Sequence, residues 1–179
     1  MMISNWLDWG WGHVAMMKVA IFPGGFDPLT RGHLDIIKRG SQLFDELAVV
    51  VDTRNNPDTI FTVDERVEQI KYLMSPYDNI TVITANELNV KLMDRIGAQY
   101  LIRGLRNTTD FQRERDVASM NVHLDNRVET VFMLTDPKYQ HVSSTLIRQY
   151  AKEGKNVSDY LPPLVNKQLL EKIEALKTN

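Results

Sequence analysis

A glycine pair and a histidine follow the first apolar run of the chain. Gly24 and Gly25 come shortly after the run Lys18–Phe22, and His33 comes eight residues after Gly25. Adjacent glycines let backbone amides approach a phosphate closely. We expect His33 in the first turn of a helix, where anions are favoured and an imidazole can donate a hydrogen bond to a phosphate oxygen. The alternative is a common glycine-rich turn beside a packing or surface histidine, since the segment is neither a Walker A loop nor a G-x-G-x-x-G fingerprint.

Two arginines close the fourth apolar run. Arg103 and Arg106 flank Gly104 and Leu105 directly after Gln99–Ile102. Guanidinium groups are forked donors that suit phosphates and carboxylates, and ligands of parallel sheets bind beyond the carboxyl ends of the strands. A solvated charged face is the alternative, but the apolar neighbours and the strand rule favour a ligand-binding pair.

Hydroxyl side chains follow the fifth apolar run, Glu129–Leu134. Ser143, Ser144 and Thr145 stand where we expect the next helix to begin. Such residues commonly cap helix N-termini, and the same hydroxyls and amides can bind phosphate. The two interpretations are compatible, so this segment is a third candidate part of a phosphate site.

Short apolar runs alternate with longer amphipathic stretches. We expect strands at Lys18–Phe22, Glu46–Val51, Ile80–Ile83, Gln99–Ile102 and Glu129–Leu134. We expect helices near His33–Gln42, Val63–Met74, Glu87–Ile96, Asp110–Leu124, Ser144–Glu153 and about Pro162 to Leu176. This alternation predicts an α/β fold, a Rossmann-like five-stranded parallel sheet with helices on both faces. Thr62 and Glu65 form a capping box, and Gly97 and Gly154 stand where C-cap glycines are expected.

The composition is that of an ordinary globular chain. Its 179 residues are 43% hydrophobic and 25% charged, with a net charge of -2, so no overall positive charge attracts nucleic acid or an anionic membrane. No apolar run reaches the roughly 20 residues that a membrane helix needs. The absence of cysteine excludes thiolate chemistry and fits a reducing cytoplasm, where we expect the protein.

The first 16 residues differ from the rest. They contain all three tryptophans, have little periodicity, and lack the basic start and apolar stretch of a signal peptide. We interpret residues 1–16 as an N-terminal extension outside the core, with an aromatic docking tail as the alternative. Residues 17–179 contain no linker or internal repeat, which predicts a single domain.

The glycine–histidine segment resembles the signature of the HxGH nucleotidyltransferase superfamily. Thr30 stands at its first histidine, and that substitution is similar to the phosphopantetheine adenylyltransferase family, whose pattern is close to PG(T/S)FDPxTxGH. The IRGLR motif ending at Arg106 and the DFxxE motif ending at Glu114 are also intact. The resemblance extends from Lys18 to the last helix.

The resemblance implies an enzyme that transfers AMP from ATP to 4′-phosphopantetheine, giving dephospho-coenzyme A and pyrophosphate. It implies His33 as the transition-state stabiliser, with Arg106 as a second catalytic group. The implied ATP-binding residues are Gly25, Phe26, His33, Gly104, Leu105, Arg106, Glu114, Tyr139, Val142, Ser143, Ser144 and Thr145. The implied acceptor-binding residues are Gly25, Asn89, Arg103 and Asn121, with Arg54 as a further candidate.

Several departures from the family pattern lie mainly on the acceptor side. Gly25 replaces a Thr or Ser whose hydroxyl touches phosphate, and Pro57 stands at the position of a lysine between the two reacting phosphates. Arg54 is the candidate substitute cation. Gln149 replaces a glutamate, and Asn89 replaces part of a Leu-Met pair that lines the pantetheine pocket. Three alternatives follow: a compensated enzyme, a transferase that uses nicotinamide mononucleotide or an alcohol phosphate, or a weakened or non-catalytic nucleotide-binding relative.

The resemblance also implies partners and assembly. Mg²⁺ would bind through the ATP phosphates, because no carboxylate cluster suggests a dedicated metal cage. We expect no nucleic-acid or membrane partner. A homohexamer and feedback by coenzyme A are implied by the family alone.

Overall fold

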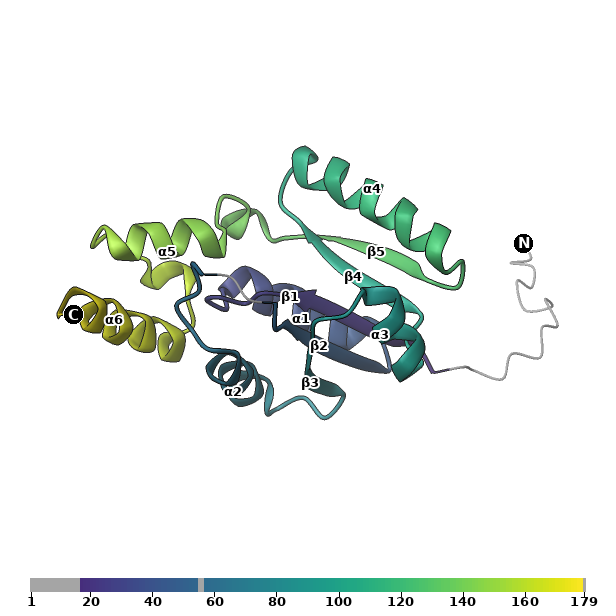
Figure 1. Ribbon diagram of the computed structural model, residues 1–179, viewed down its shortest axis with the longest axis horizontal. Coiled ribbons are helices and arrows are strands. Elements are labelled where there is room, and N and C mark those ends of the chain that lie inside the picture. Colours follow the sequence, from purple (N-terminus) through teal and green to yellow (C-terminus); the bar gives the residue numbers. More distant parts are fainter. Residues whose placement is uncertain (1–16, 55–56, 179) are drawn as a thin grey trace, which may run out of the picture.

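The computed structural model describes residues 17–54 and 57–178. Its centre is a sheet of five parallel strands in the spatial order β3-β2-β1-β4-β5 (Figure 1). The strands are β1 (Val19–Gly24), β2 (Glu46–Asp52), β3 (Ile80–Ala85), β4 (Tyr100–Leu105) and β5 (Glu129–Leu134). The predicted Rossmann-like parallel sheet is confirmed. The predicted N-terminal extension lies outside the described residues, and the single domain stays a prediction.

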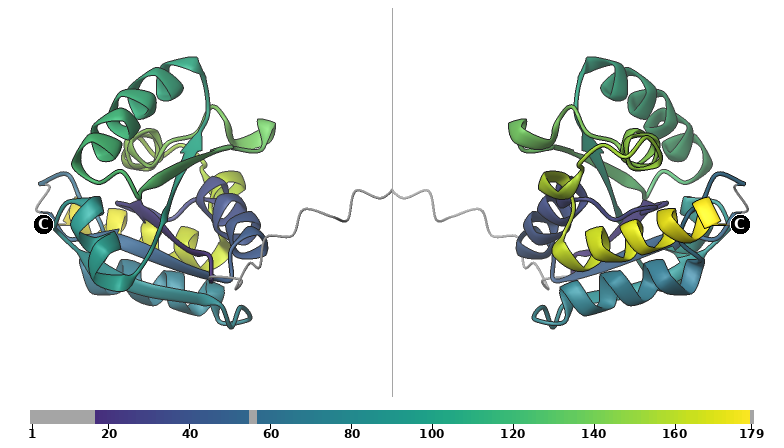
Figure 2. Two further views of the ribbon diagram at one scale, coloured as in Figure 1. Left: turned by 90° about the vertical axis from the view of Figure 1, so that its right-hand side faces the viewer. Right: turned by 90° about the vertical axis from the view of Figure 1, so that its left-hand side faces the viewer.

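Helices cover both faces of the sheet, as predicted (Figure 2). They are α1 (Arg31–Leu43), α2 (Val63–Met74), α3 (Asn89–Ile96), α4 (Thr108–Leu124), α5 (Ser144–Lys152) and α6 (Pro163–Thr178), with short 3-10 helices η1 (Pro137–Tyr139) and η2 (Ser158–Tyr160). The helices α1, α2, α5 and α6 share one apolar core with the sheet, whereas α3 packs on the opposite face. None of the helices in the described part of the chain has the length and apolar character needed to cross a membrane.

The central strands β1 and β2 are buried on both faces. Successive side chains of a strand point to opposite sides, so Phe22 and Val49 enter the core beneath α1 and α2, whereas Ile21 and Val50 enter the core beneath α3. This two-sided burial is the physical reason for the almost continuous apolar sequence of these strands.

Strand β4 is longer than predicted. Residues 103–105 pair with residues 132–134 of β5, so the predicted end at Ile102 is wrong. Ladder hydrogen bonds to β5 satisfy the backbone of this polar segment. The first arginine of the IRGLR motif therefore lies within the strand, and only Arg106 lies beyond it.

Local capping signals position the helix ends. The capping box of Thr62 and Glu65 is confirmed at the start of α2. Gly97 and Gly154 adopt positive φ angles of 70° and 76° after α3 and α5, a conformation that favours glycine. The start of α1 is earlier than predicted, because Thr30 caps it and Arg31 is its first residue.

The strand order sets the place of a ligand site. The chain runs from β1 outward to β2 and β3, and then returns to β4 on the other side of β1. The carboxyl ends of β1 and β4 flank the point where the winding direction reverses, and ligands of open α/β sheets bind at such a point.

Candidate active site

A cavity of about 310 Å³ opens at the carboxyl ends of β1 and β4, and we call it the first cavity. Its walls come from the loop after β1, the start of α1, the end of β4, the first turns of α4 and the segment between β5 and α5. His33, Arg106 and Ser144 all line it. The structure therefore brings together the histidine, arginine and serine segments that the sequence singled out.

The hydrogen bonds at the start of α1 orient the ring of His33. The backbone N–H of Thr30 donates to Nδ1 of His33 over 3.1 Å, and the backbone N–H of His33 donates to Oγ1 of Thr30 over 3.2 Å. This reciprocal arrangement is a capping box in which His33 takes the place of the usual glutamate or glutamine. Because Nδ1 accepts a hydrogen bond, the neutral imidazole carries its proton on Nε2.

The environment of His33 keeps its imidazole neutral. Burial and, to a smaller extent, the positive charge of Arg106 together lower the pKa of His33 from 6.5 to about 4. A neutral imidazole with a proton on Nε2 is a hydrogen-bond donor at neutral pH. It can donate to a phosphate oxygen without first taking up a proton.

The ring of Phe26 fixes the other side of this histidine. Phe26 is buried and contacts His33 edge-on, with ring centroids 5.1 Å apart at 81°. Its backbone has a φ of 49°, in the left-handed region that is uncommon for residues other than glycine. A Cβ on Gly24 would lie 2.9 Å from the ring of Phe26, so the first glycine of the pair makes room for that ring.

Both arginines of the IRGLR motif are held by carboxylates of α4. Arg103 donates to the two Oε atoms of Glu114 over 2.7 and 2.6 Å, and Arg106 donates to the two Oδ atoms of Asp110 over 2.8 and 3.1 Å. Such bidentate pairs fix the plane of a guanidinium group. Arg106 also donates to the carbonyl of Val142 over 3.2 Å, which ties β4 to the segment before α5.

The serines at the start of α5 support the fold as well as the cavity. Ser143 is the N-cap, and its Oγ accepts from the N–H of Leu146 over 3.1 Å. Oγ of Ser144 donates to the carbonyl of Pro28 over 2.9 Å and thereby ties α5 to the loop after β1. Tyr139 lines the same cavity.

A second cavity of about 410 Å³ adjoins the first along the end of β1. It is lined by residues at the ends of β2 and β3, including Asp52, Arg54, Glu87 and Asn89. The two cavities share five lining residues, which are Pro23, Gly24, Arg103, Arg113 and Glu114. These shared residues form the boundary between the cavities.

A third cavity of about 270 Å³ reaches His33 from the side of α2 and α5. Gly25, Arg54, Ser144 and Thr145 line it. The φ of Gly25 is not positive, and a Cβ built on it would have no atom within 4 Å. The missing family hydroxyl at this position thus leaves open space rather than a rearranged backbone.

Buried charged groups behind the loop after β1 hold its carbonyl groups. Nη1 of Arg66 donates to the carbonyls of Gly25 and Asp52 over 2.6 and 3.1 Å, and Arg66 is 4% exposed. Arg148 donates to the carbonyl of Asp27. The Asp27 carboxylate accepts from the N–H of Phe61 over 2.8 Å. Satisfied carbonyls leave the loop amides as the groups available to an anionic ligand.

Two of the predicted site residues do not line any of the three cavities. Leu105 is buried in β4, and Asn121 is buried on α4 with an Nδ2 that has no hydrogen-bond partner among the described residues. Their predicted contacts with ATP and with the acceptor stay predictions. The other predicted residues each line at least one cavity.

Sequence reasoning missed several charged residues of the site: Asp27, Asp52, Arg66, Asp110, Arg113 and Arg148. Asp27 and Asp110 belong to the quoted motifs, so they were within reach. Arg66 and Arg148 lie on helices that carry several other charges, and only the packing against the loop after β1 distinguishes them. Within residues 17–54 and 57–178, no group of three or more His, Asp or Glu side chains is arranged to hold a metal ion.

Comparison with known proteins assigns the family. Residues 21–150 match the cytidylyltransferase-like family. The chain is 58% identical over 157 residues to the phosphopantetheine adenylyltransferase of Limosilactobacillus reuteri strain DSM 20016, covering 88% of this chain and 91% of the relative. This chain belongs to the phosphopantetheine adenylyltransferase family. The family member of Heliobacterium modesticaldum is 44% identical over 156 residues, covering 87% of this chain and 93% of the relative.

The fold of this phosphopantetheine adenylyltransferase family member extends to more distant proteins. A solved structure from Vibrio parahaemolyticus, whose name includes the words nicotinate-nucleotide adenylyltransferase, aligns with a TM-score of 0.67 at 20% identity. The alignment covers 88% of this chain and 95% of the other. At this identity the likeness supports the fold alone.

Proposed function

We propose that this chain transfers AMP from ATP to 4′-phosphopantetheine, giving dephospho-coenzyme A and pyrophosphate. The observation that carries the proposal is the 58% identity with a phosphopantetheine adenylyltransferase over 157 residues. The geometry supports it, since an imidazole, guanidinium groups and two helix N-termini surround one cavity, and a second cavity adjoins it.

The reaction needs little covalent chemistry from the protein. The phosphate of the acceptor is an anionic nucleophile at neutral pH, so it attacks the α-phosphorus of ATP in line without a general base, and pyrophosphate leaves. Catalysis then depends on positioning and on stabilising the negative charge of the transition state.

The residues of the first cavity fit these tasks. His33 donates from Nε2 to the α-phosphate, because its Nδ1 already accepts from Thr30. Arg106 and the start of α5 at Ser143 and Ser144 hold the departing pyrophosphate. Gly104, Glu114 and Tyr139 surround the nucleoside.

The second cavity fits the acceptor. Arg103 lies at its boundary with the first cavity, where the acceptor phosphate must meet the α-phosphate. Asn89 and the end of β2 line the remainder and receive the pantetheine arm. Coenzyme A carries the same arm, so feedback by coenzyme A would act by competition here.

Mg²⁺ fits this site only as a companion of the nucleotide. Glu114 and Asp110 are bound by arginines, and the Asp27 carboxylate binds backbone amides, so oxygen ligands would come from ATP. The ion would neutralise phosphate charge when bound.

A homohexamer is the proposed assembly. Helix α4 exposes several large apolar side chains, each 43–58% exposed: Phe111, Val117, Met120, Val122 and Leu124. Large exposed apolar surfaces typically mark protein contacts. Analytical ultracentrifugation tests this directly, and a monomer at micromolar concentration would contradict it.

Pyrophosphate release tests the proposed reaction. Purified protein with ATP and Mg²⁺ is incubated with 4′-phosphopantetheine, with nicotinamide mononucleotide, or with an alcohol phosphate. We expect release with 4′-phosphopantetheine and a product with the mass of dephospho-coenzyme A. Release only with another acceptor would reassign the substrate, and ATP binding by calorimetry without any release would indicate a non-catalytic relative.

A further inference from the structure

Six arginines line the three cavities, and they differ in how their charges are compensated. Three of them pair with carboxylates at their own edge of the cleft: Arg103 with Glu114, Arg106 with Asp110 and Arg54 with Asp52. Two are bound behind the loop after β1: Arg66 by carbonyl groups and Arg148 by Asp27. The sixth is Arg113.

Arg113 is the exception among these cations. It lies on α4 and lines both the first and the second cavity, and it makes no hydrogen bond or ion pair with any residue in the described part of the chain. The carboxylates near it on α4 are paired with other arginines: Asp110 with Arg106, Glu114 with Arg103 and Asp116 with Arg115. The charge of Arg113 acts on Asp110 only through space. The guanidinium group of Arg113 is therefore available to a ligand without the loss of an existing contact.

The position of Arg113 coincides with the place where charge is most needed. The boundary between the two cavities receives the acceptor phosphate and the α-phosphate of ATP. The Arg103–Glu114 pair at this boundary is neutral as a unit, so it compensates little of the charge of a phosphate dianion.

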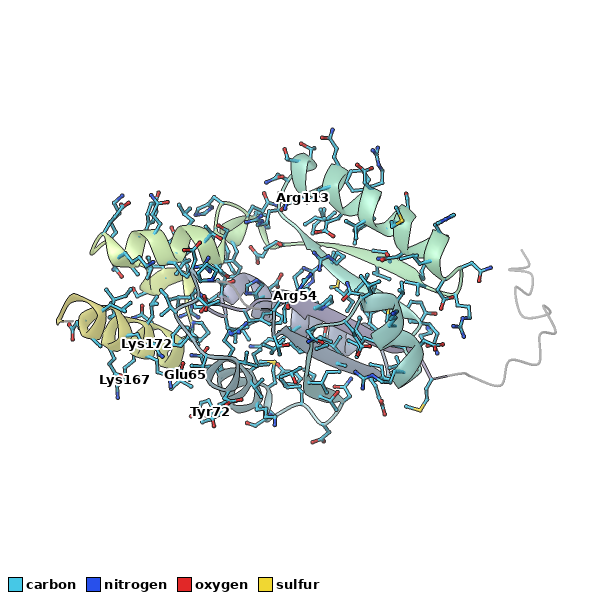
Figure 3. All side chains as sticks on the ribbon, viewed as in Figure 1. Arg54, Glu65, Tyr72, Arg113, Lys167 and Lys172 are labelled. Carbon is cyan, nitrogen blue, oxygen red and sulfur yellow. The ribbon has the colours of Figure 1, made fainter. Side chains whose placement is uncertain are left out.

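The loop after β2 does not supply the missing cation. Pro57 has no charge to offer, and Arg54 is held by its neighbour: its Nε donates to both Oδ atoms of Asp52 over 3.0 and 2.9 Å. The side chain of Arg54 is also 76% exposed. Figure 3 labels both arginines, and they reach the second cavity from different elements, Arg113 from α4 and Arg54 from the end of β2.

We propose that Arg113 binds the acceptor phosphate at the boundary between the two cavities, and that it supplies the positive charge which the position of Pro57 lacks. The inference rests on the proposed function, because it assumes an acceptor whose reacting group is a phosphate. Arg113 then determines specificity for a phosphorylated acceptor over the same acceptor without phosphate.

The test compares Arg113→Gln with Arg115→Gln, a control on the same helix that removes the same charge outside the cavities. We measure kcat/KM for 4′-phosphopantetheine, and by calorimetry the affinities for 4′-phosphopantetheine and for pantetheine. In Arg113→Gln we expect kcat/KM and the affinity for 4′-phosphopantetheine to fall by about 10–100-fold, the usual effect of losing a hydrogen bond to a charged group. The affinity for pantetheine, which has no phosphate, should change less than twofold, and Arg115→Gln should match the wild type.

Two further variants sharpen the result. Arg113→Lys should recover part of the affinity for 4′-phosphopantetheine, because it keeps the charge and loses the fork. Adding Pro57→Lys to Arg113→Gln should restore activity if the two positions serve the same phosphate.

The outcomes separate the inference from the proposed function. An effect in Arg54→Gln that equals or exceeds that in Arg113→Gln would overturn the inference, and so would an equal loss of affinity for pantetheine. If the wild type releases no pyrophosphate with 4′-phosphopantetheine, the proposed function fails. The calorimetric comparison still decides whether Arg113 binds its phosphate.

Discussion

On the proposed nucleotide side of the cleft, two groups that face the cavity also hold the fold together, whereas two arginines on the proposed acceptor side do not. His33 is part of the capping box of α1, and Ser143 caps α5. On the other side, Arg54 forms an exposed pair with a residue two positions away. Arg113 is exposed and forms no ion pair with any residue that the structure describes. Groups used by the fold are constrained in sequence and geometry, and groups used only by a ligand are free to change. Two of the departures from the family pattern, Gly25 and Asn89, line the second cavity, which we propose for the acceptor.

The largest effect expected from this comparison lies on the nucleotide side. Replacing His33 by alanine should lower kcat by about 10²–10³, the usual cost of losing one donor to a developing oxyanion. ATP affinity by calorimetry should change much less, because the helix N-termini and Arg106 remain. His141→Ala is the matched control, since His141 is exposed, lines none of the three cavities, and contacts the ring and hydroxyl of Tyr160. Activity near the wild-type level in His33→Ala would remove His33 from the mechanism.

The support behind the loop after β1 should affect both sides at once. Arg66→Met removes the buried guanidinium group that donates to the carbonyls of Gly25 and Asp52, and we expect the free energy of unfolding to fall by about 2–4 kcal/mol. KM should rise for both substrates, because the loop lies between them. Arg66→Lys should show a smaller fall in the free energy of unfolding and a smaller rise in both KM values. Urea unfolding and initial rates measure these effects. A KM change confined to one substrate would contradict the expectation that the loop supports both substrate sites.

The pKa of His33 predicts a pH dependence of stability. The folded chain has a pKa of about 4 at this residue, against 6.5 for an ordinary histidine. Between these values the unfolded chain binds a proton that the folded chain does not, so stability falls as the pH falls from about 6.5 toward 4. At about pH 5 this contribution amounts to roughly 2 kcal/mol. On transfer from about pH 7.5 to about pH 5, the free energy of unfolding of His33→Gln should therefore fall by roughly 2 kcal/mol less than that of the wild type. An equal fall in the variant and the wild type would contradict the low pKa of His33.

The smallest effect is expected on the acceptor side, where a side chain can be added without rearrangement. Gly25→Ser places a hydroxyl in open space next to the third cavity, so stability should stay within about 0.5 kcal/mol of the wild type. The added donor should raise kcat/KM for 4′-phosphopantetheine by up to about fivefold, about 1 kcal/mol for one hydrogen bond. A loss of activity without a loss of stability would mean that the open space is occupied by substrate.

Much of this architecture could be predicted from the sequence, because strand burial, helix caps and the site motifs each correspond to a local sequence pattern. Two-sided burial produced the apolar runs of β1 and β2, and the motif residues His33, Arg106 and Ser144 were correctly expected to meet. The end of β4 was placed too early, since its polar residues form a strand only because β5 lies beside them. The capping role of His33 was also missed, because histidine is not the residue usually found at that position.

Ion pairing was the part that the sequence could not convey. Pairing depends on side-chain distances. The positions of Arg54 and Arg113 in the sequence do not reveal that Arg54 is held by Asp52, whereas Arg113 forms no hydrogen bond or ion pair with a described residue and acts on Asp110 only through its charge. Arg54, the predicted substitute cation, lines the second and third cavities, and its charge is paired with Asp52. Its role stays a prediction.

Arg66 and Arg148 bind carbonyl groups of the loop after β1, and the Asp27 carboxylate of that loop accepts from the backbone N–H groups of Ile60 and Phe61. The entropy cost of ordering that loop therefore belongs to folding, and binding of a nucleotide needs little further ordering of the loop. Substrate contacts facing the cleft can then be exchanged one at a time during evolution while the shape of the loop is inherited unchanged. Replacement of a Thr or Ser by Gly25 would leave the open space that is found beside this residue.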